Sequence, residues 1–432
     1  AAADAFDHLQ VGVLFGAFTA VLILFIVPIT LLGTISPFAI RLALKDSRDA
    51  GKISGRIYAI STLGSFVGTF LPVLVMIPLM GTIFTFLVFA GFLTLVALSG
   101  LWQNSGFKAA LKWSWMLLVL AIIAILWGCG AIKTSVGQIY ETESAYNYIQ
   151  VLEKDSYRYL RLNEGQGIHS IYHPEQLAFH GPWMQVLAAP FFNPSPFQPK
   201  QMKSLAIVGL AAGTISTQVT EVFGPIPIDG FEIDPEIIRV GQDYFGMIQP
   251  NLNPIPQDGR WGLAHSQRKY TVISIDAYRP PYIPWHLTTR EFFQIVRDHL
   301  SAEGVLVINV GRAPGDRRLI EGLAATIGTI FPSIHVMDIP DTFNSIVYAT
   351  VQPTDIDNLR ANIQALQASE NVHPLLLDAV QRAFTYRQPN PCEPPDPAPG
   401  CIIFTDDKAP IEWITNNMVL NYVLFSGVDE LK

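Results

Sequence analysis

The sequence has 432 residues, of which 50% are hydrophobic and only 15% are charged, and its mean hydropathy is +0.32. Soluble domains carry roughly a quarter charged residues, so the composition argues against an ordinary soluble globule. Residues 1–135 carry a net charge of +4 and the remainder −12, which argues against nucleic-acid binding, and 48 aromatic residues exclude a disordered chain.

Four uncharged apolar stretches near the N-terminus are each long enough to cross a bilayer, which takes about 20 residues. They are residues 11–32, 57–79, 82–102 and 113–131. We therefore predict that residues 1–135 form a transmembrane segment with four spans in contact with membrane lipid.

The loops between these spans differ in charge. The first and third loops carry the basic residues Arg41, Lys45, Arg48, Lys52, Arg56, Lys108 and Lys112. The positive-inside rule places both loops in the cytoplasm. Four spans then put the soluble part on the outer side, and we expect a multi-pass protein of a bacterial cell membrane.

Two cysteines bear on the same question. Cys392 and Cys401 bracket a Pro-rich loop, residues 393–400. A disulfide between them requires an oxidising compartment, whereas two reduced thiols are equally compatible with the spacing. The sequence leaves both alternatives open.

The soluble part begins with short strand-like runs. Residues 148–152 and 157–162 alternate as strands do, a Glu-Gly-Gln-Gly turn follows, and residues 190–199 are rich in Pro and Phe. We predict a small β domain with a linker over residues 136–200.

From residue 204 apolar strands alternate with helices. The predicted strands are 204–210, 228–233, 270–275, 304–310, 333–337 and 344–350, and the predicted helices are 214–222, 235–244 and 288–300. This alternation predicts an α/β doubly wound, Rossmann-like domain with a parallel sheet over residues 201–352. Residues 353–432 are predicted to hold two helices, the Pro-rich loop and an Asp406-Asp407 segment.

Ligands of open α/β sheets bind beyond the carboxyl ends of the strands. A turn of small residues that includes Gly209, Ala211 and Gly213 follows the first predicted strand and would let a ligand approach the backbone. Glu232 ends the second strand, where an acid can accept both hydroxyls of a ribose. Asp258 and Gly259 follow the next strand position, either to accept from an adenine amino group or as a Pro-rich surface turn.

The loop after the fourth strand, residues 276–286, contains two Tyr, one Trp and three Pro. This composition is typical of loops that build a pocket. A small-residue turn with a ribose-type and an adenine-type acid suits NAD or S-adenosylmethionine. Because G-x-G-x-x-G is missing, the sulfonium cofactor is favoured.

These motifs together resemble the spermidine synthase family. The segments that carry the resemblance are residues 143–149, 209–214, 231–235, 258–260 and 276–278. Residues 61–65 and 405–410 extend it to the membrane-fused branch, whose members usually begin with further spans. The resemblance implies a class I methyltransferase-type fold.

The resemblance also implies a reaction. It is aminopropyl transfer from decarboxylated S-adenosylmethionine to a polyamine, with Glu232 on the ribose, Asp258 near the adenine and Asp276 taking the amine proton. S-adenosylmethionine itself, and hence methyl transfer, stays open. Tyr278 either stacks on a base, or polarises the acceptor, or is a core aromatic. We expect no metal, because His173, His180 and His286 lack ligand spacing.

Two further positions are assigned from the resemblance. Gln166 lies where the β domain of the family reaches the cofactor, with a simple turn role as the alternative. Asn147 stands where the family has Gln. Synthases of the family commonly pair through their β domains, so a homodimer is an expectation.

Departures from the family pattern concern the acceptor. Ala212 and Arg279 replace family aspartates that would contact a cationic amine, so we expect an unknown small-molecule acceptor other than putrescine. Asp406 and Asp407 either replace the missing acids or form a solvated turn. The alternative function is a degenerate domain that serves as a structural or assembly subunit of a larger membrane complex.

Overall fold

The computed structural model describes residues 13–44, 46–128, 130, 132–163, 167–279, 282–313, 315–393 and 398–426. Its contacts divide the chain into two compact units. One comprises residues 1–134, 143–146 and 423–432, and the other residues 135–142 and 147–422.

The first unit is helical. Its elements are α2 (Val13–Ala43), η1 (Ser47–Asp49), α3 (Ala50–Leu71), a π-helical turn η2 (Pro72–Met76), α4 (Ile77–Ser105), α5 (Phe107–Trp113) and α6 (Trp115–Trp127). Three helical stretches among the described residues are long and apolar enough to cross a membrane, namely Phe18–Ala43, Ala50–Ser105 and Phe107–Trp127. Residues 11, 12, 129 and 131 of the predicted spans lie outside the described part of the chain.

The 56-residue stretch Ala50–Ser105 covers two of the predicted spans, 57–79 and 82–102. Gly81 lies between them with φ 79° and ψ 170°, outside the helical region, so the backbone breaks at the predicted turn. The predicted first loop is shorter than expected because Arg41 lies in the last turn of α2 and Lys52 lies in α3.

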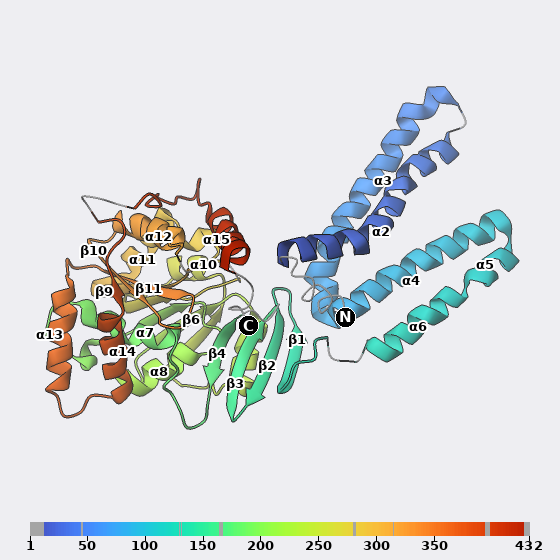
Figure 1. Ribbon diagram of the computed structural model, residues 1–432. Helices are drawn as coiled ribbons and strands as arrows, with labels where there is room; N and C mark the ends of the chain where they lie inside the picture. Colours follow the sequence, from blue (N-terminus) through green and yellow to red (C-terminus); the bar gives the residue numbers. More distant parts are fainter. Residues whose placement is uncertain are drawn as a thin grey trace. The chain divides into compact units, whose positions relative to one another are not determined.

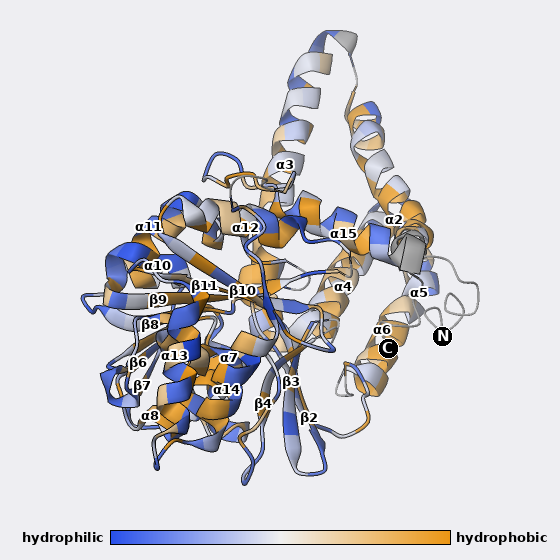
Figure 2. Ribbon diagram, turned by 60° about the vertical axis from the view of Figure 1, so that its left-hand side comes forward, coloured by the Kyte–Doolittle hydropathy of each residue, from blue (hydrophilic) through white to orange (hydrophobic). Residues whose placement is uncertain are grey.

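Large apolar side chains of these helices point outward. Ile23, Leu24 and Ile125 are 67%, 66% and 77% exposed, and Figure 2 shows hydrophobic residues along the helices of this unit. Exposed apolar surface of this extent is unfavourable in water and favourable in lipid.

The second unit begins with an antiparallel sheet in the order β1-β2-β3-β4. Its strands are β1 (Gln138–Glu143), β2 (Tyr148–Lys154), β3 (Tyr157–Leu162) and β4 (Ile168–Tyr172). Both strands predicted here are present. Val151 and Leu160 of this sheet are buried in one cluster with Ile237 and Val240, so the small sheet packs on the following domain.

The large sheet has the order β12-β10-β11-β9-β8-β5-β6-β7. Its strands are β5 (Leu205–Val208), β6 (Ile228–Glu232), β7 (Leu252–Pro256), β8 (Tyr270–Ile275), β9 (Leu300–Gly311), β10 (Ser333–Asp338), β11 (Asn344–Thr350) and β12 (Arg387–Gln388).

Five of these strands, β5 to β9, are parallel, which confirms the Rossmann-like prediction. The expectation of a parallel sheet throughout is wrong at one edge, where β10, β11 and β12 pair antiparallel. Five residues connect β10 to β11, and a parallel pairing needs a crossover of a dozen or more.

Helices cover both faces of the large sheet (Figure 1). They are α7 (Pro182–Gln185), η3 (Val186–Phe192), η4 (Pro199–Gln201), α8 (Thr214–Phe223), α9 (Pro235–Tyr244), α10 (Gly259–Ala264), η5 (Trp285–Leu287), α11 (Arg290–His299), α12 (Arg318–Gly328), α13 (Ile356–Gln367), α14 (Pro374–Thr385) and α15 (Ile411–Ser426). Alternate residues of β5 contribute to two buried clusters, one with α8, α13 and α14 and the other with α11 and α12.

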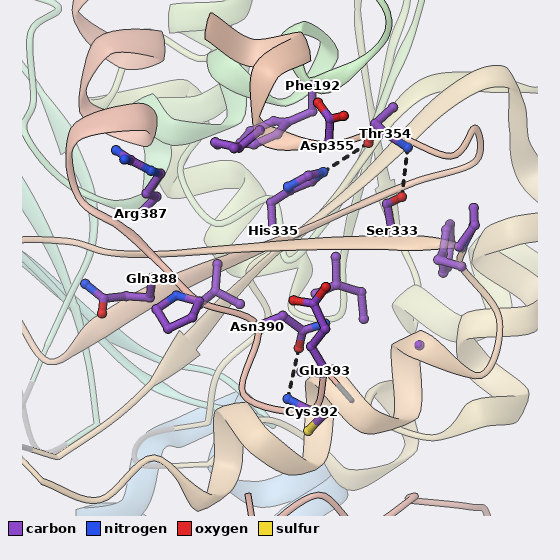
Figure 3. A pocket seen from close by; sticks show the side chains of 18 of the residues that line it. Phe192, Ser333, His335, Thr354, Asp355, Arg387, Gln388, Asn390, Cys392 and Glu393 are labelled. Carbon is purple, nitrogen blue, oxygen red and sulfur yellow. Dashed lines mark hydrogen bonds between the residues drawn. The ribbon is translucent and has the colours of Figure 1, made fainter. Parts of the chain in front are cut away.

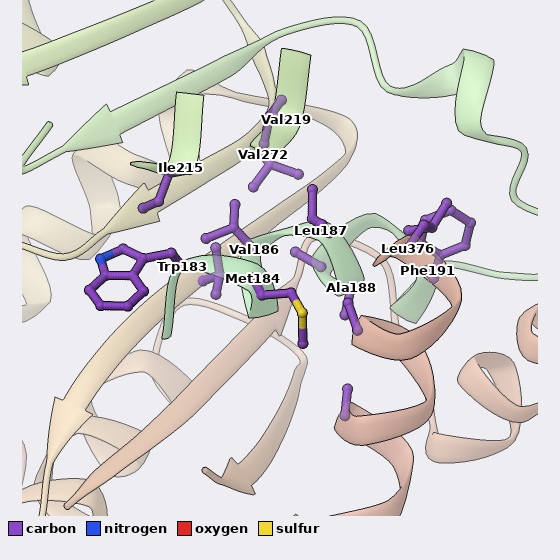
Figure 4. Packing of buried hydrophobic residues seen from close by; sticks show 14 of the residues in the cluster. Trp183, Met184, Val186, Leu187, Ala188, Phe191, Ile215, Val219, Val272 and Leu376 are labelled. Carbon is purple, nitrogen blue, oxygen red and sulfur yellow. The ribbon is translucent and has the colours of Figure 1, made fainter. Parts of the chain in front are cut away.

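The Pro/Phe-rich connection is part of the core. Figure 4 shows Phe191 of this connection close to Leu376 of α14, with Met184 and Leu187 of the preceding segment packed nearby, and Phe191, Phe192 and Phe197 of the connection are buried. The predicted linker is therefore an internal segment of the large domain. Its burial explains why the connection contains several aromatic residues.

Candidate functional site

Strand register brings the predicted residues to one edge of the sheet. Val208 at the end of β5 pairs with Phe231 of β6 and with Ile275 of β8. The residues that follow these three are Gly209, Glu232 and Asp276, so they lie side by side at the carboxyl ends of parallel strands. Asp258 follows β7, which pairs with β6 on its other side.

The turn after β5 has an unusual backbone. Gly209, Ala211 and Gly213 have φ values of 90°, 49° and 87°, which residues other than Gly rarely adopt. A Cβ on Gly209 would lie 2.5 Å from the carbonyl oxygen of Asp276. The glycine thus lets the loop after β8 approach the turn after β5.

Substituting Gly209→Ala is expected to lower the free energy of unfolding by about 3 kcal/mol, because the new Cβ would be strained and would collide with backbone. Gly224→Ala is a matched control, since Gly224 has φ 81° and nothing within 4 Å of its ideal Cβ. It should cost about 1 to 2 kcal/mol from strain alone. Urea unfolding of the full chain, followed by tryptophan fluorescence, measures both, and equal losses would contradict the collision.

Glu232 is buried behind this turn. Its Oε2 accepts from the Ala211 N–H at 2.9 Å and its Oε1 from the Asp234 N–H at 3.2 Å. Burial raises the pKa of Glu232 to about 7, and the backbone donors oppose that rise. The carboxyl group therefore titrates near neutral pH, next to exposed Ile233.

Asp258 caps α10. It accepts from the Trp261 N–H at 2.9 Å, and its Oδ2 lies 3.0 Å from His286 Nε2, whose hydrogen bond lowers the pKa of Asp258. A Cβ on Gly259 would lie 2.4 Å from Val208 Cγ1, so packing against β5 accounts for this glycine.

Asp276 follows β8 and keeps some exposed surface. Its Oδ1 accepts from Asn309 Nδ2 at 2.8 Å. Burial raises the pKa of Asp276 to about 6, and the bond from Asn309 opposes the rise. The Tyr278 hydroxyl donates to the Asn309 carbonyl at 3.1 Å, and burial raises the pKa of Tyr278.

Asn147 joins the small sheet to the large domain. Its Nδ2 donates to Asp234 Oδ2 at 2.9 Å and its Oδ1 accepts from Asn163 at 3.0 Å. The side chain is therefore used in structural contacts beside α9. Gln166, the other residue predicted from the β domain, lies outside the described residues.

The structure also shows the environments of Ala212 and Arg279, which depart from the family pattern. Ala212 is 2% exposed, so a carboxylate at this position would be buried. Arg279 is exposed and its backbone pairs with Tyr282.

Asp406 binds Arg260 at 2.8 and 2.7 Å and accepts from Thr289 at 2.7 Å. This carboxylate is thus committed to joining the 405–408 turn to α10 and α11. That setting favours the turn interpretation over a replacement for the missing acids.

Sequence reasoning missed three polar contacts of the site. Asn309 bonds to Asp276, Asn344 bonds to Asn309, and His286 bonds to Asp258. Asn309 did carry a signal, because it is the polar residue within the apolar strand 304–310. From the sequence, His286 is considered only as a metal ligand, and Asn344 stands at a strand end.

A cavity of about 1230 Å³ lies at the other edge of the sheet, beside β10 and β12 (Figure 3). His335, Arg387 and Glu393 are among its lining residues, and His335 is hydrogen-bonded to Thr354 at 3.0 Å. None of the described site residues predicted from the sequence lines it. Cys392, also in the lining, forms a disulfide with Cys401. Residues 394–397 of the Pro-rich loop lie outside the described chain.

No family model matches the chain. The probable polyamine aminopropyl transferase of Bifidobacterium longum is 31% identical over 288 residues, which are 63% of this chain and 61% of that relative, less than two thirds of its length. The polyamine aminopropyltransferase of Vibrio vulnificus is 29% identical over 250 residues, 54% of this chain and 79% of that protein.

The human eEF1A lysine and N-terminal methyltransferase is 27% identical over 163 residues, 35% of this chain and 23% of that protein. The aminopropyltransferase relatives are the more extensive matches. Together with the Rossmann-like sheet, these similarities support a spermidine synthase-like family.

Proposed function

We propose that the chain is a membrane-anchored transferase that moves the aminopropyl group of decarboxylated S-adenosylmethionine to an amine other than putrescine. The observation that carries the proposal is the set of three carboxylates, Glu232, Asp258 and Asp276, gathered at neighbouring strand ends around a turn of small residues. Relatives named aminopropyltransferases support the donor.

The chemistry follows from these positions. Glu232 accepts from the ribose hydroxyls, and Asp258 accepts from the adenine amino group. The amine lone pair attacks the propyl carbon bonded to sulfur. A C–N bond forms as the C–S bond breaks, and the electron pair stays on sulfur in methylthioadenosine. Asp276 takes the proton from the new ammonium group, for which a pKa of about 6 suits it near neutral pH.

The acceptor is proposed from the two departures. A buried Ala212 and a cationic Arg279 stand where a dicationic amine would need carboxylates. An acceptor with a single reactive amine and a neutral or anionic remainder fits these positions better than putrescine.

The membrane anchor is proposed from the apolar helices of the first unit and the soluble part is proposed on the outer side from the basic loops. This topology counts Ala50–Ser105 as two crossings that meet at Gly81. Protease protection of the soluble part in sealed inside-out vesicles tests it, and digestion there would place this part in the cytoplasm.

Methyl transfer from S-adenosylmethionine is the second candidate, and the match to a methyltransferase favours it. The third candidate is a structural subunit without turnover. It is supported by the missing acceptor carboxylates and by the hydrogen bond between Asp258 and His286. The three candidates differ in whether they bind a nucleoside and in which one they prefer.

Calorimetric titration of the detergent-purified chain is the deciding experiment. Decarboxylated S-adenosylmethionine, S-adenosylmethionine and methylthioadenosine are titrated into the wild type and into Glu232→Ala. We expect binding that Glu232→Ala weakens at least tenfold, with the decarboxylated donor preferred. Preference for S-adenosylmethionine would favour methyl transfer, and absence of binding by the folded protein would leave the structural subunit.

A further inference from the structure

Asn309 is the central contact of Asp276. The side chain is 7% exposed and uses both ends of its amide. Nδ2 donates to Asp276 Oδ1 at 2.8 Å, and Oδ1 accepts from Asn344 Nδ2 at 2.9 Å. Three side chains from neighbouring strands thus form one hydrogen-bonded row.

Strand register explains how the row forms. Ile275 of β8 pairs with Ile308 of β9, so the next residues, Asp276 and Asn309, are neighbours. Asn344 opens β11 opposite Gly311, two residues beyond Asn309 and hence on the same face of the sheet. The row crosses β8, β9 and β11 at the proposed acceptor side.

The row fixes the direction of the Asn309 amide. An amide offers a donor at one end and an acceptor at the other. Because Asn344 donates to Oδ1, the Nδ2 end must face Asp276. With the amide reversed, its oxygen would face the carboxylate, and the Asn344 donor would face another donor.

The orientation of the Asn309 amide affects the pKa of Asp276. Among the described residues the Asn309 amide of β9 is the hydrogen-bond partner of its side chain, Tyr278 follows two residues later in the same loop, and Gly209 approaches the backbone of Asp276. No cation is hydrogen-bonded to it within the described chain. The Asn309 N–H is therefore the group that opposes the rise in the pKa of this partly buried carboxyl.

We propose that Asn309 and Asn344 are positioning residues for the proton-accepting carboxylate. Asn344 holds the Asn309 amide in one orientation, and Asn309 binds Oδ1 of Asp276, so that Oδ2 faces the acceptor amine. Among the described residues Oδ2 has no hydrogen-bond partner. This inference rests on the proposed function.

An infrared pH titration of the Asp276 carboxyl band tests the row without turnover. The detergent-purified full chain is used, with the band assigned by its loss in Asp276→Asn. Asn309→Leu, similar in volume but without a donor, should raise the measured pKa by about one unit or more. Asn344→Leu should raise it by less, since the amide is still present but free to turn.

Ser345→Ala is the matched control. Ser345 is the next residue of β11, is buried, and donates to Asp338 on the other face of the sheet. Its loss disturbs the same strand without touching the row, so the Asp276 titration should not move. A pKa unchanged in both Asn variants, or moved as far by Ser345→Ala, would overturn the proposal.

Kinetics add a second readout. In the wild type, kcat/KM for the amine should rise with pH, and the midpoint of this rise should move to higher pH in Asn309→Leu and Asn344→Leu. A wild type without turnover on any primary amine would defeat the proposed function alone, because the infrared shift stands independently. Turnover with an unmoved midpoint would defeat the positioning role alone.

Discussion

The variant Asp276→Asn is expected to lose turnover by about a thousandfold while keeping its affinity for methylthioadenosine within about threefold. Asparagine cannot take the ammonium proton. Its carbonyl oxygen can still accept the bond that Asn309 now donates to Asp276 at 2.8 Å, so the local geometry survives. The rate of methylthioadenosine release measures turnover, and calorimetry measures affinity.

Asp298→Asn provides the matched control for this substitution. Asp298 is exposed on α11 and accepts from Gln294, away from the strand ends. Its loss should leave both rate and affinity unchanged. If Asp276→Asn abolished nucleoside binding together with turnover, Asp276 would be a binding residue, and an unchanged rate would place the proton acceptor elsewhere.

The second large effect is a pH dependence of nucleoside binding that is carried by Glu232. Burial raises the pKa of this carboxyl to about 7. Ribose hydroxyls bind the ionised form, so binding must release the proton that the free protein holds below that pKa. Affinity for methylthioadenosine should therefore rise about tenfold from about pH 6 to about pH 8, and level off above the pKa.

Glu232→Gln should weaken binding at least tenfold at about pH 8 and remove most of the pH dependence, because the amide does not titrate. Calorimetry in two buffers of different ionisation enthalpy measures the released proton directly. Glu236→Gln is the matched control, since this acid of α9 pairs with Arg239 and not with the turn. A wild-type affinity that is flat with pH would contradict the assignment.

The raised pKa of Glu232 also fixes the sign of its effect on folding. The folded protein holds this proton more tightly than the unfolded chain, whose carboxyl has a pKa near 4.5. The contribution of Glu232 to stability is therefore present at low pH and is lost as the pH rises through about 7. Bound nucleoside should offset that loss.

Much of the fold could be predicted from the sequence because its signals are local. Continuous hydrophobic segments in the sequence identify the apolar helices of the first unit and the strands 270–275 and 344–350. The start of α9 is equally local, since Asp234 caps the helix and Pro235 opens it. These features depend on neighbours in the chain.

The strand-end positions of the site could also be predicted from the sequence. Glu232 ends one apolar strand and Asp276 directly follows another, and parallel strands end at one edge of a sheet. Their raised pKa values could not be predicted, because burial depends on the helices and loops that cover the strand ends.

The partners of the site residues follow from the three-dimensional fold. Asp406 meets Arg260 across 146 residues, Asn147 meets Asp234 across 87, and Asn309 meets Asn344 across 35. Periodicity and local capping are enough to predict a helical apolar segment, an α/β domain and the acids at its strand ends. Which amide or cation each acid meets follows from strand register and loop packing, because a hydrogen bond between distant residues requires a specific placement of both backbones that no local pattern encodes.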